Sequence, residues 1–391
     1  MSTLKVDAIR HNSATSDAIT TASDGTCTAR ITGMTGGGGL SHRNLFVNGA
    51  CQIGQRGSTS LGSGYGGVDR WVQFIGSGGV TTTSQDTDAP TGQGFRKSIK
   101  LDVTTAVASG SSNWAWLGQY IEAKDCQSVC KGTSNAKQLT LQFWVKSPKT
   151  GTHTVRLDVQ DSSDGVGATY TVSSANTWEK KTVTFPASTS GTINDDNGRG
   201  IHVLWVLSAG TTYSSGTLNT TWASWTNANT APGQPNILDS TSNNFYLTGV
   251  QLEVGDTATT FEHRSFGEEL SLCYRYYYKL GKLDYIGQHM SAGEQYCIGM
   301  SDNDDLNIYG MINFPVNMRT PPTGIDATSA GNYRVRRDTT KNCSGVPTFT
   351  DAAHHYCRVN FPKSGHGWGT GQMLWCQSGG SGSYLGFSAE L

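Results

Sequence analysis

The stretch Leu139-Thr140-Leu141-Gln142-Phe143-Trp144-Val145 places Leu139, Leu141, Phe143 and Val145 at every second position. Successive side chains of an extended strand point to opposite faces, so this period of two predicts a strand with one buried face. The pattern recurs in residues 45–47, 98–103, 154–159, 178–185, 201–207 and 245–253. Gly, Ser, Asn and Asp residues, which favour turns, separate these segments. We therefore predict an antiparallel β-sandwich of the jelly-roll type over residues 41–263.

The composition of the whole chain agrees with an all-β fold. Gly, Ser and Thr make up 137 of the 391 residues, or 35%, and charged residues make up 15%, against about 25% in an average soluble domain. The formal net charge is −1. Such a chain offers no basic surface for a polyanion, so nucleic acid and acidic membranes are not expected partners.

The segments on either side of the sandwich have different patterns. Residues 1–40 are rich in Ser, Thr and Ala and end in a run of four glycines, which predicts an arm that becomes ordered only against a partner. Its first residues lack an apolar leader, and no run of 18 apolar residues occurs, so we expect synthesis in a cytoplasm and no membrane insertion. Residues 283–391 return to short strands and predict a smaller β domain.

One helix is predicted between the two β domains, over residues 264–282. Ser265 and Glu268 have the spacing of a capping box, and Gly281 is a suitable stop. Tyr274, Tyr277 and Tyr278 have helical spacing, which predicts packing in a core or along a trimer axis. The nine cysteines are odd in number and scattered, and we expect most of them to be free and buried.

Several motifs resemble tail-fibre-like, receptor-binding proteins of tailed phages, especially those of cyanobacteria and other marine bacteria. The start Met1-Ser2-Thr3-Leu4-Lys5-Val6-Asp7 and the segment 23–28 resemble virion-attachment ends. A second set resembles the carbohydrate-binding-module-like sandwich of such fibres: residues 48–49, 53–57, 65, 68–71 and 250–255. Residues 273–278, 314–323 and 386–391 are similar to the fibre tails. The resemblance implies a homotrimeric virion protein, attached through residues 1–40 to a tail or adaptor protein. Because no extended coiled-coil or repeat shaft is present, it favours a short fibre, a tail-spike-like appendage or a head-surface fibre.

Catalytic and metal sites are not favoured by the sequence. Gly62-Ser63-Gly64-Tyr65-Gly66-Gly67 matches a dinucleotide loop, but a predicted strand follows it instead of a helix. The acidic segments 161–165 and 302–305 are typical of Asx-rich turns, with structural calcium left open. His354, His355 and His366 lack the arrangement of a metal or nucleophile site. We expect no enzyme and no cofactor.

Aromatic residues are the best candidates for a binding site. Exposed aromatic rings stack on the C–H faces of sugars, while neighbouring amides and hydroxyls bind sugar hydroxyl groups. Eight candidates lie in Gly-, Ser- and Asn-rich surroundings: Trp114, Trp116, Tyr213, Trp222, Trp225, Trp368, Trp375 and Tyr384. Packing inside the sandwich or against a sister chain is the alternative.

The sequence thus predicts a short phage tail fibre, made in the bacterial host cytoplasm and located on the virion, that binds a neutral or mixed-charge host surface glycan. Two other roles stay open at this point. One is architectural, as a head fibre, decoration protein or tail adaptor, and the other is a polysaccharide depolymerase.

Overall fold

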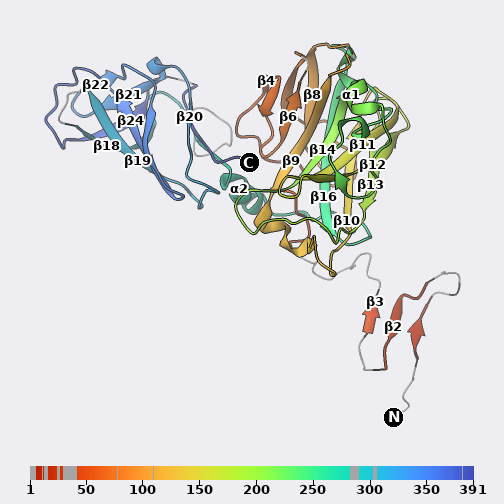
Figure 1. The fold of residues 1–391 in the computed structure, drawn as a ribbon. Helices are drawn as coiled ribbons and strands as arrows, with labels where there is room; N and C mark the ends of the chain where they lie inside the picture. The colour runs from red at the N-terminus through yellow and green to blue at the C-terminus, as the bar shows by residue number, and fades with distance from the viewer. Residues whose placement is uncertain are drawn as a thin grey trace.

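The computed structural model describes residues 6–10, 12, 16–23, 27–29, 42–76, 78–108, 110–281, 290–302, 306–380 and 382–391. The protein is all-β, and its sheets are antiparallel. Three parts follow one another along the chain: a small N-terminal sheet, a large β-sandwich and a smaller C-terminal β domain (Figure 1). Within the described residues, no helix is long and apolar enough to cross a membrane.

The N-terminal sheet consists of β1 (Ala8–Ile9), β2 (Ile19–Thr21) and β3 (Cys27–Ala29). Thr20 of β2 faces Ala8 on one side and Thr28 on the other. The apolar side chains of Val6 and Ile9 are exposed, so the described part of this sheet buries no core of its own. The predicted dependence of residues 1–40 on a partner stays a prediction, and much of that segment lies outside the described residues.

Two sheets form the sandwich. The six-stranded sheet has the order β13 (Glu179–Phe185), β10 (Leu139–Lys146), β16 (Asn244–Val254), β8 (Ser98–Thr105), β7 (Val80–Asp86) and β4 (Thr59–Leu61). The seven-stranded sheet has the order β15 (Ala223–Ser224), β12 (Asp164–Val172), β11 (Gly151–Val159), β14 (Arg199–Ala209), β9 (Trp114–Glu122), β6 (Val72–Ile75) and β5 (Ser63–Tyr65). The chain alternates between the sheets from β8 to β11, as in a jelly roll.

Aromatic side chains fill the space between the two sheets. The ring of Trp205 lies 5.6 Å from Trp71 and 5.3 Å from Phe143, and Phe46 packs on both tryptophans. Residues 45–47, predicted as a strand, are irregular instead. Phe46 is nevertheless fully buried, because Asn44 fixes this segment by hydrogen bonds to β16 at Val250 O and Leu252 N.

Short helical elements connect the strands of the sandwich: η1 (Ala123–Val129), α1 (Thr211–Ser214), η2 (Asn227–Asn229) and η3 (Ile237–Asp239). The helix predicted over 264–282 is shorter than expected. Helix α2 (Phe266–Tyr274) begins after Ser265, whose Oγ accepts from Glu268 N, and it ends well before Gly281. Tyr277 and Tyr278 belong to strand β17 (Tyr277–Leu280), because they pair with β26 (Leu385–Ser388).

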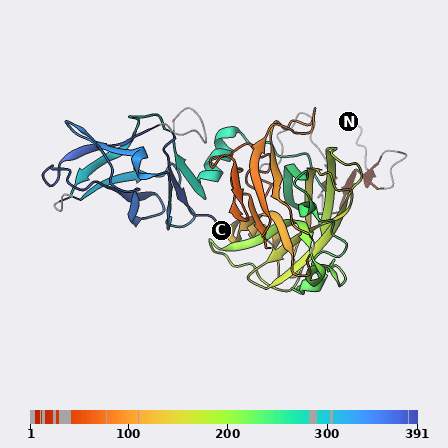
Figure 2. The same cartoon turned by 90° about the horizontal axis from the view of Figure 1, so that it is seen from above.

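The C-terminal domain has a larger and a smaller sheet (Figure 2). The larger one has the order β22 (Thr340–Asn342), β21 (Tyr333–Arg336), β25 (Met373–Ser378), β18 (Gln295–Ser301), β19 (Asn307–Asn313), β24 (Tyr356–Pro362) and β23 (Thr348–Ala352). The smaller one contains β17, β26 and β20 (Ile325–Ala327), and η4 (Ala330–Asn332) precedes β21. Their facing side chains form a separate core around Tyr333, Phe361 and Phe387.

A polar interface joins the sandwich to the C-terminal domain. The carboxylate of Glu390 accepts from the guanidinium groups of Arg56 and Arg70 of the sandwich. Glu122, at the end of β9, accepts from Arg275 Nε and Tyr276 Oη, both at 2.9 Å. All of these residues except Glu122 come from the segments that carry the resemblance to phage fibres. In this structure, such motif residues fasten two domains together.

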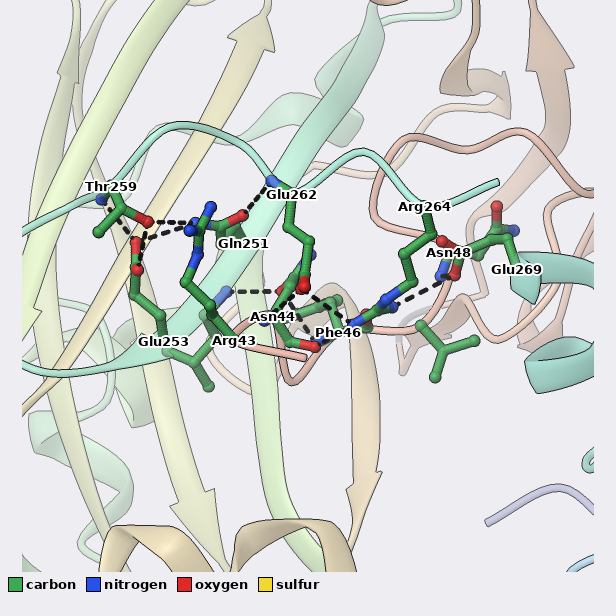
Figure 3. Close-up of polar contacts among 12 residues, drawn as sticks. Arg43, Asn44, Phe46, Asn48, Gln251, Glu253, Thr259, Glu262, Arg264 and Glu269 are labelled. Carbon is green, nitrogen blue, oxygen red and sulfur yellow. Dashed lines mark hydrogen bonds and ion pairs between the residues drawn. The ribbon is translucent and has the colours of Figure 1, made fainter. Parts of the chain in front are cut away.

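A second buried polar network holds the entry of the chain into the sandwich (Figure 3). Asn44 N donates to Glu262 Oε2 at 2.9 Å, and Arg264 Nη1 donates to Phe46 O at 2.9 Å. Asn48 N donates to Glu269 of α2. The segment from Asn44 to Asn48 is therefore hydrogen-bonded to β16, to Glu262 and Arg264, and to α2.

Candidate functional site

The main candidate site is a hollow of about 340 Å³ on the outer face of the seven-stranded sheet. Strands β9, β11 and β14 form its floor, and the segment 210–231, which contains α1, β15 and η2, forms its wall. Residues of both parts line it: Trp114, Tyr120, Arg156, Asp158, Gln160, Arg199, Gly200, His202, Tyr213, Trp225, Thr226, Asn227 and Thr230.

Aromatic rings of the floor and the wall meet at this hollow. Trp114 of β9 stacks on Tyr213 of α1, with ring centroids 5.1 Å apart and planes inclined by 25°. Backbone hydrogen bonds hold the wall in place: Ala231 N donates to Tyr213 O at 2.9 Å, and Trp225 N donates to Ser163 O at 3.3 Å. The Trp225 side chain is 47% exposed. An indole so exposed on a fixed loop can receive the flat face of a ligand.

A row of side chains with ring contacts crosses the floor. The imidazole of His202 lies 4.0 Å from the ring of Tyr120 and 4.5 Å from that of Trp116, centroid to centroid. The guanidinium carbon of Arg199 lies 4.2 Å from the Tyr120 centroid on a cation–π contact. Gly118 makes this row possible, because a Cβ there would lie 3.1 Å from His202 Nε2 and 2.3 Å from Val203 O.

Two polar residues that line the hollow, Arg156 and His202, each have one buried nitrogen without a protein partner. Arg156 Nη2 donates to Asp158 Oδ1 at 2.8 Å and Nη1 donates to Thr230 O at 3.3 Å, but its buried Nε has no hydrogen-bond partner. Burial raises the pKa of Asp158, and the neighbouring Arg156 opposes this rise. His202 Nε2 is also buried without a partner. Buried polar groups are normally satisfied, so these two atoms beside the hollow are exceptions to the rule.

His202 is neutral at physiological pH. Burial, together with the smaller effect of the positive charges of Arg199 and Arg156, lowers its pKa to about 3. A neutral imidazole has one donor and one acceptor nitrogen, so it can either donate a hydrogen bond to a hydroxyl group or accept one from it.

The structure brings three of the eight predicted aromatic residues together in this hollow, namely Trp114, Tyr213 and Trp225. Trp116 lies on the same sheet face but is only 9% exposed, because it packs with Leu204, Val206 and Ala231. Trp222 packs on the sandwich core, donates from Nε1 to Pro186 O at 2.7 Å and carries Lys131 Nζ 4.4 Å above its ring.

The remaining three candidates lie apart from the hollow, in the C-terminal domain. Trp368 is buried against His366, with ring centroids 5.7 Å apart. Tyr384 donates to Asp326 Oδ1 at 3.1 Å and lies under Lys279 Nζ. Trp375 is 44% exposed on the outer face of the larger sheet. It lies with other exposed apolar side chains of that face: Ile298, Met300, Met311 and Met373.

Sequence reasoning did not predict the polar members of the hollow as binding residues. Tyr120 lies six positions after Trp114 on the same strand, so the period of two places it on the same face. Arg156 and Asp158 lie two positions apart on β11, so they also share a face. Arg199 could not be found this way, because a bulge between Arg199 and Ile201 breaks the register of β14. His202 follows the bulge, and the period of two places it on the face opposite Ile201 and Val203.

The other motifs singled out in the sequence serve local structure. Asp164 pairs with Lys131 Nζ at 2.7 Å, and Asp161 accepts from Asn194 N at 2.9 Å, so protein donors occupy this acidic turn. The segment 302–305 lies mostly outside the described residues. The described part of the chain contains no group of three His, Cys, Asp or Glu side chains placed to hold a metal ion. The eight cysteines with described side chains are free, and all but Cys130 are buried, as expected.

No protein-family model matches the chain, and no curated protein matches it. Solved structures match about half of it. The enzymatically active domain of tailspike protein 4 of bacteriophage CBA120 is 13% identical over 54% of this chain and 21% of that chain, with a TM-score of 0.30. The CBM22-1 xylan-binding domain from Paenibacillus barcinonensis Xyn10C is 11% identical over 55% of this chain and 96% of that chain, with a TM-score of 0.26. A family 11 carbohydrate-binding module of a Clostridium thermocellum cellulosomal cellulase is 14% identical over 54% of this chain and 98% of that chain, with a TM-score of 0.26. The match spans about one fifth of the tailspike chain.

Proposed function

We propose that this chain binds a cell-surface glycan through the hollow of its seven-stranded sheet and serves as a short tail fibre in host adsorption by a tailed phage. The observation that carries the binding proposal is that the rings of Trp114, Tyr213 and Trp225 line one hollow together with polar side chains, namely Arg156, Asp158, Arg199 and His202. Rings stack on sugar C–H faces, and the polar atoms orient hydroxyl groups. The virion role is supported by the resemblance of the motifs to phage fibres.

We further propose that binding proceeds without cleavage. Glycoside hydrolysis requires two carboxyl groups on either side of the scissile bond. Asp158 is the one carboxylate among the described residues that line the hollow, and Arg156 already engages it. Several weak sites on one virion would supply avidity in place of chemistry.

The binding proposal is tested with the full chain and immobilised host envelope polysaccharide. Trp225→Ala removes an indole that is 47% exposed in the hollow, and Trp375→Ala removes one that is 44% exposed outside it. We expect Trp225→Ala to weaken binding about tenfold and Trp375→Ala to change it less than twofold. Equal effects of the two substitutions would contradict the hollow as the site.

The virion role requires separate experiments. Purified chain in excess should block adsorption of the phage that encodes it, and labelled antibody should decorate the tails of intact virions. Light scattering should give the mass of a trimer. Incubation with polysaccharide should release no new reducing ends, and their appearance would replace adhesion by depolymerisation.

One observation favours an architectural role as the second candidate. The exposed face of Ile298, Met300, Met311, Met373 and Trp375 is a contiguous apolar surface on the larger C-terminal sheet. Exposed apolar patches of this kind mark contacts with other proteins. Antibody decoration of the head, together with unimpaired adsorption in the presence of excess chain, would favour this candidate over the fibre.

A further inference from the structure

We infer that the hollow takes an acidic glycan, with Arg199 receiving the carboxylate of a uronic acid unit. This inference rests on the glycan-binding function proposed above and adds the chemical class of the ligand. It departs from the neutral or mixed-charge glycan that the composition of the whole chain predicts.

The first argument is that Arg199 carries a positive charge into the hollow, while the carboxylate on the neighbouring strand is bound by other residues. Its guanidinium lies over Tyr120, and the residue is exposed. Glu122 is its register partner on the neighbouring strand. The carboxylate of Glu122 is already bound by Arg275 and Tyr276 at the domain interface. Arg199 therefore remains available to an anion from outside the protein.

The second argument is the charge balance of the hollow. The charge of Asp158 is matched by Arg156, whose Nη2 lies 2.8 Å from Asp158 Oδ1. His202 is neutral, since its pKa is lowered to about 3. Among the described residues that line the hollow, the charge of Arg199 is thus left without a counterpart. A single negative charge on the ligand would balance it.

The third argument is geometric. A guanidinium is a planar fork that matches the two oxygens of a carboxylate. A uronic acid carries its carboxylate on the edge of a pyranose ring, so one sugar unit offers a face for aromatic stacking and an anion beside it. The hollow offers the complementary pair: ring faces at Trp225 and Tyr213, and a cation at Arg199.

The test compares oligosaccharides that differ only in the charge of the carboxyl group. Trimers of galacturonic, mannuronic and guluronic acid are titrated into the full chain by calorimetry, each beside its methyl ester. We expect at least one acid to bind about tenfold more tightly than its ester, with a preference that declines as NaCl rises from 50 to 500 mM.

Variants assign the preference to Arg199. Arg199→Gln should bring the ratio of acid to ester affinity close to one, whereas Arg199→Lys should retain most of it. Thermal melting establishes that both variants are folded. Esters that bind as tightly as their acids would overturn the inference and leave the glycan-binding function standing. If neither acids, esters nor host polysaccharide bind, the proposed function falls with it.

Discussion

Arg70 donates from Nη1 to Glu390 Oε2 across 320 positions of sequence, and both side chains are buried in the pair. Arg70 also donates to Tyr120 O at 2.5 Å and lies over the ring of Tyr276. The carboxylate of Glu390 raises the pKa of Arg70 against the opposing effect of burial. This contact links the C-terminal domain to β9, the strand that carries Trp114 and Tyr120, so it holds the C-terminal domain against the floor of the hollow.

We predict that Glu390→Gln destabilises the protein by about 3 kcal/mol, because it leaves Arg70 buried without a counter-charge. The free energy of unfolding in urea measures this loss. Replacing both partners in Arg70→Met/Glu390→Leu should cost less than Glu390→Gln alone, since Arg70 is then removed together with its counter-charge and only Arg56 loses a partner. A double variant less stable than Glu390→Gln would contradict the assignment.

Gly118 provides a prediction on the floor of the hollow. Gly118→Ala would put a Cβ 2.3 Å from Val203 O, so the two central strands must separate and the imidazole of His202 must shift. We expect a loss of stability of about 1–3 kcal/mol, the usual range for overpacking.

The matched control for this substitution is Gly267→Ala. Gly267 lies in the first turn of α2, and a Cβ there meets no atom within 4 Å. Alanine should stabilise the helix by up to about 1 kcal/mol. Thermal melts of the two variants check both signs, and equal melting temperatures would rule out the steric argument.

The sequence allowed the sandwich to be predicted but only part of the site. The period of two in residues 139–145 and 201–207 identified β10 and β14, because a sheet with one buried face repeats every second residue. The helical spacing of Tyr274, Tyr277 and Tyr278 was misleading. Strand β26, more than 100 residues later, supplies the hydrogen bonds that make Tyr277 and Tyr278 extended.

The charge balance of the hollow also depends on contacts that the local sequence does not reveal. Arg199 and Asp158 are ordinary surface residues in the sequence, and only the neighbouring strands decide whether a counter-charge lies beside each. Asp158 has Arg156 two positions away on its own strand, a pair that the sequence already contains. Arg199 lacks a counter-charge because the Glu122 carboxylate is bound by Arg275, which lies 153 positions further along the chain. Long-range competition of this kind has no local signal.

The lowered pKa of His202 predicts how stability depends on pH. The unfolded chain binds a proton at this residue near pH 6.5, whereas the folded protein resists protonation down to about pH 3. The unfolded state therefore gains protons first, and the contribution of His202 to stability falls as the pH drops below 6.5.

His202→Gln keeps a donor and an acceptor but does not titrate. We expect the melting temperature of the wild-type protein, relative to this variant, to fall between pH 7.5 and pH 4.5. All other groups contribute alike to the two proteins and cancel in the difference. Parallel melting curves over this range would show that His202 does not stay neutral in the folded state.

The free cysteines give the last prediction. Burial raises the pKa of Cys51 and Cys126 to about 12, and Cys130 is the one partly exposed thiol among the cysteines with described side chains. Thiolates react with alkylating reagents and buried thiols do not. Short treatment of the native protein with iodoacetamide should therefore label Cys130 and spare Cys51 and Cys126, as peptide mass spectrometry can measure. Labelling in guanidinium chloride should reach all three at similar rates.

The control for this prediction is Cys130→Ser, which should remove that label from the native protein without a change in melting temperature. Native labelling of Cys51 at a rate close to that of Cys130 would show that the sandwich opens around Phe46 and β16.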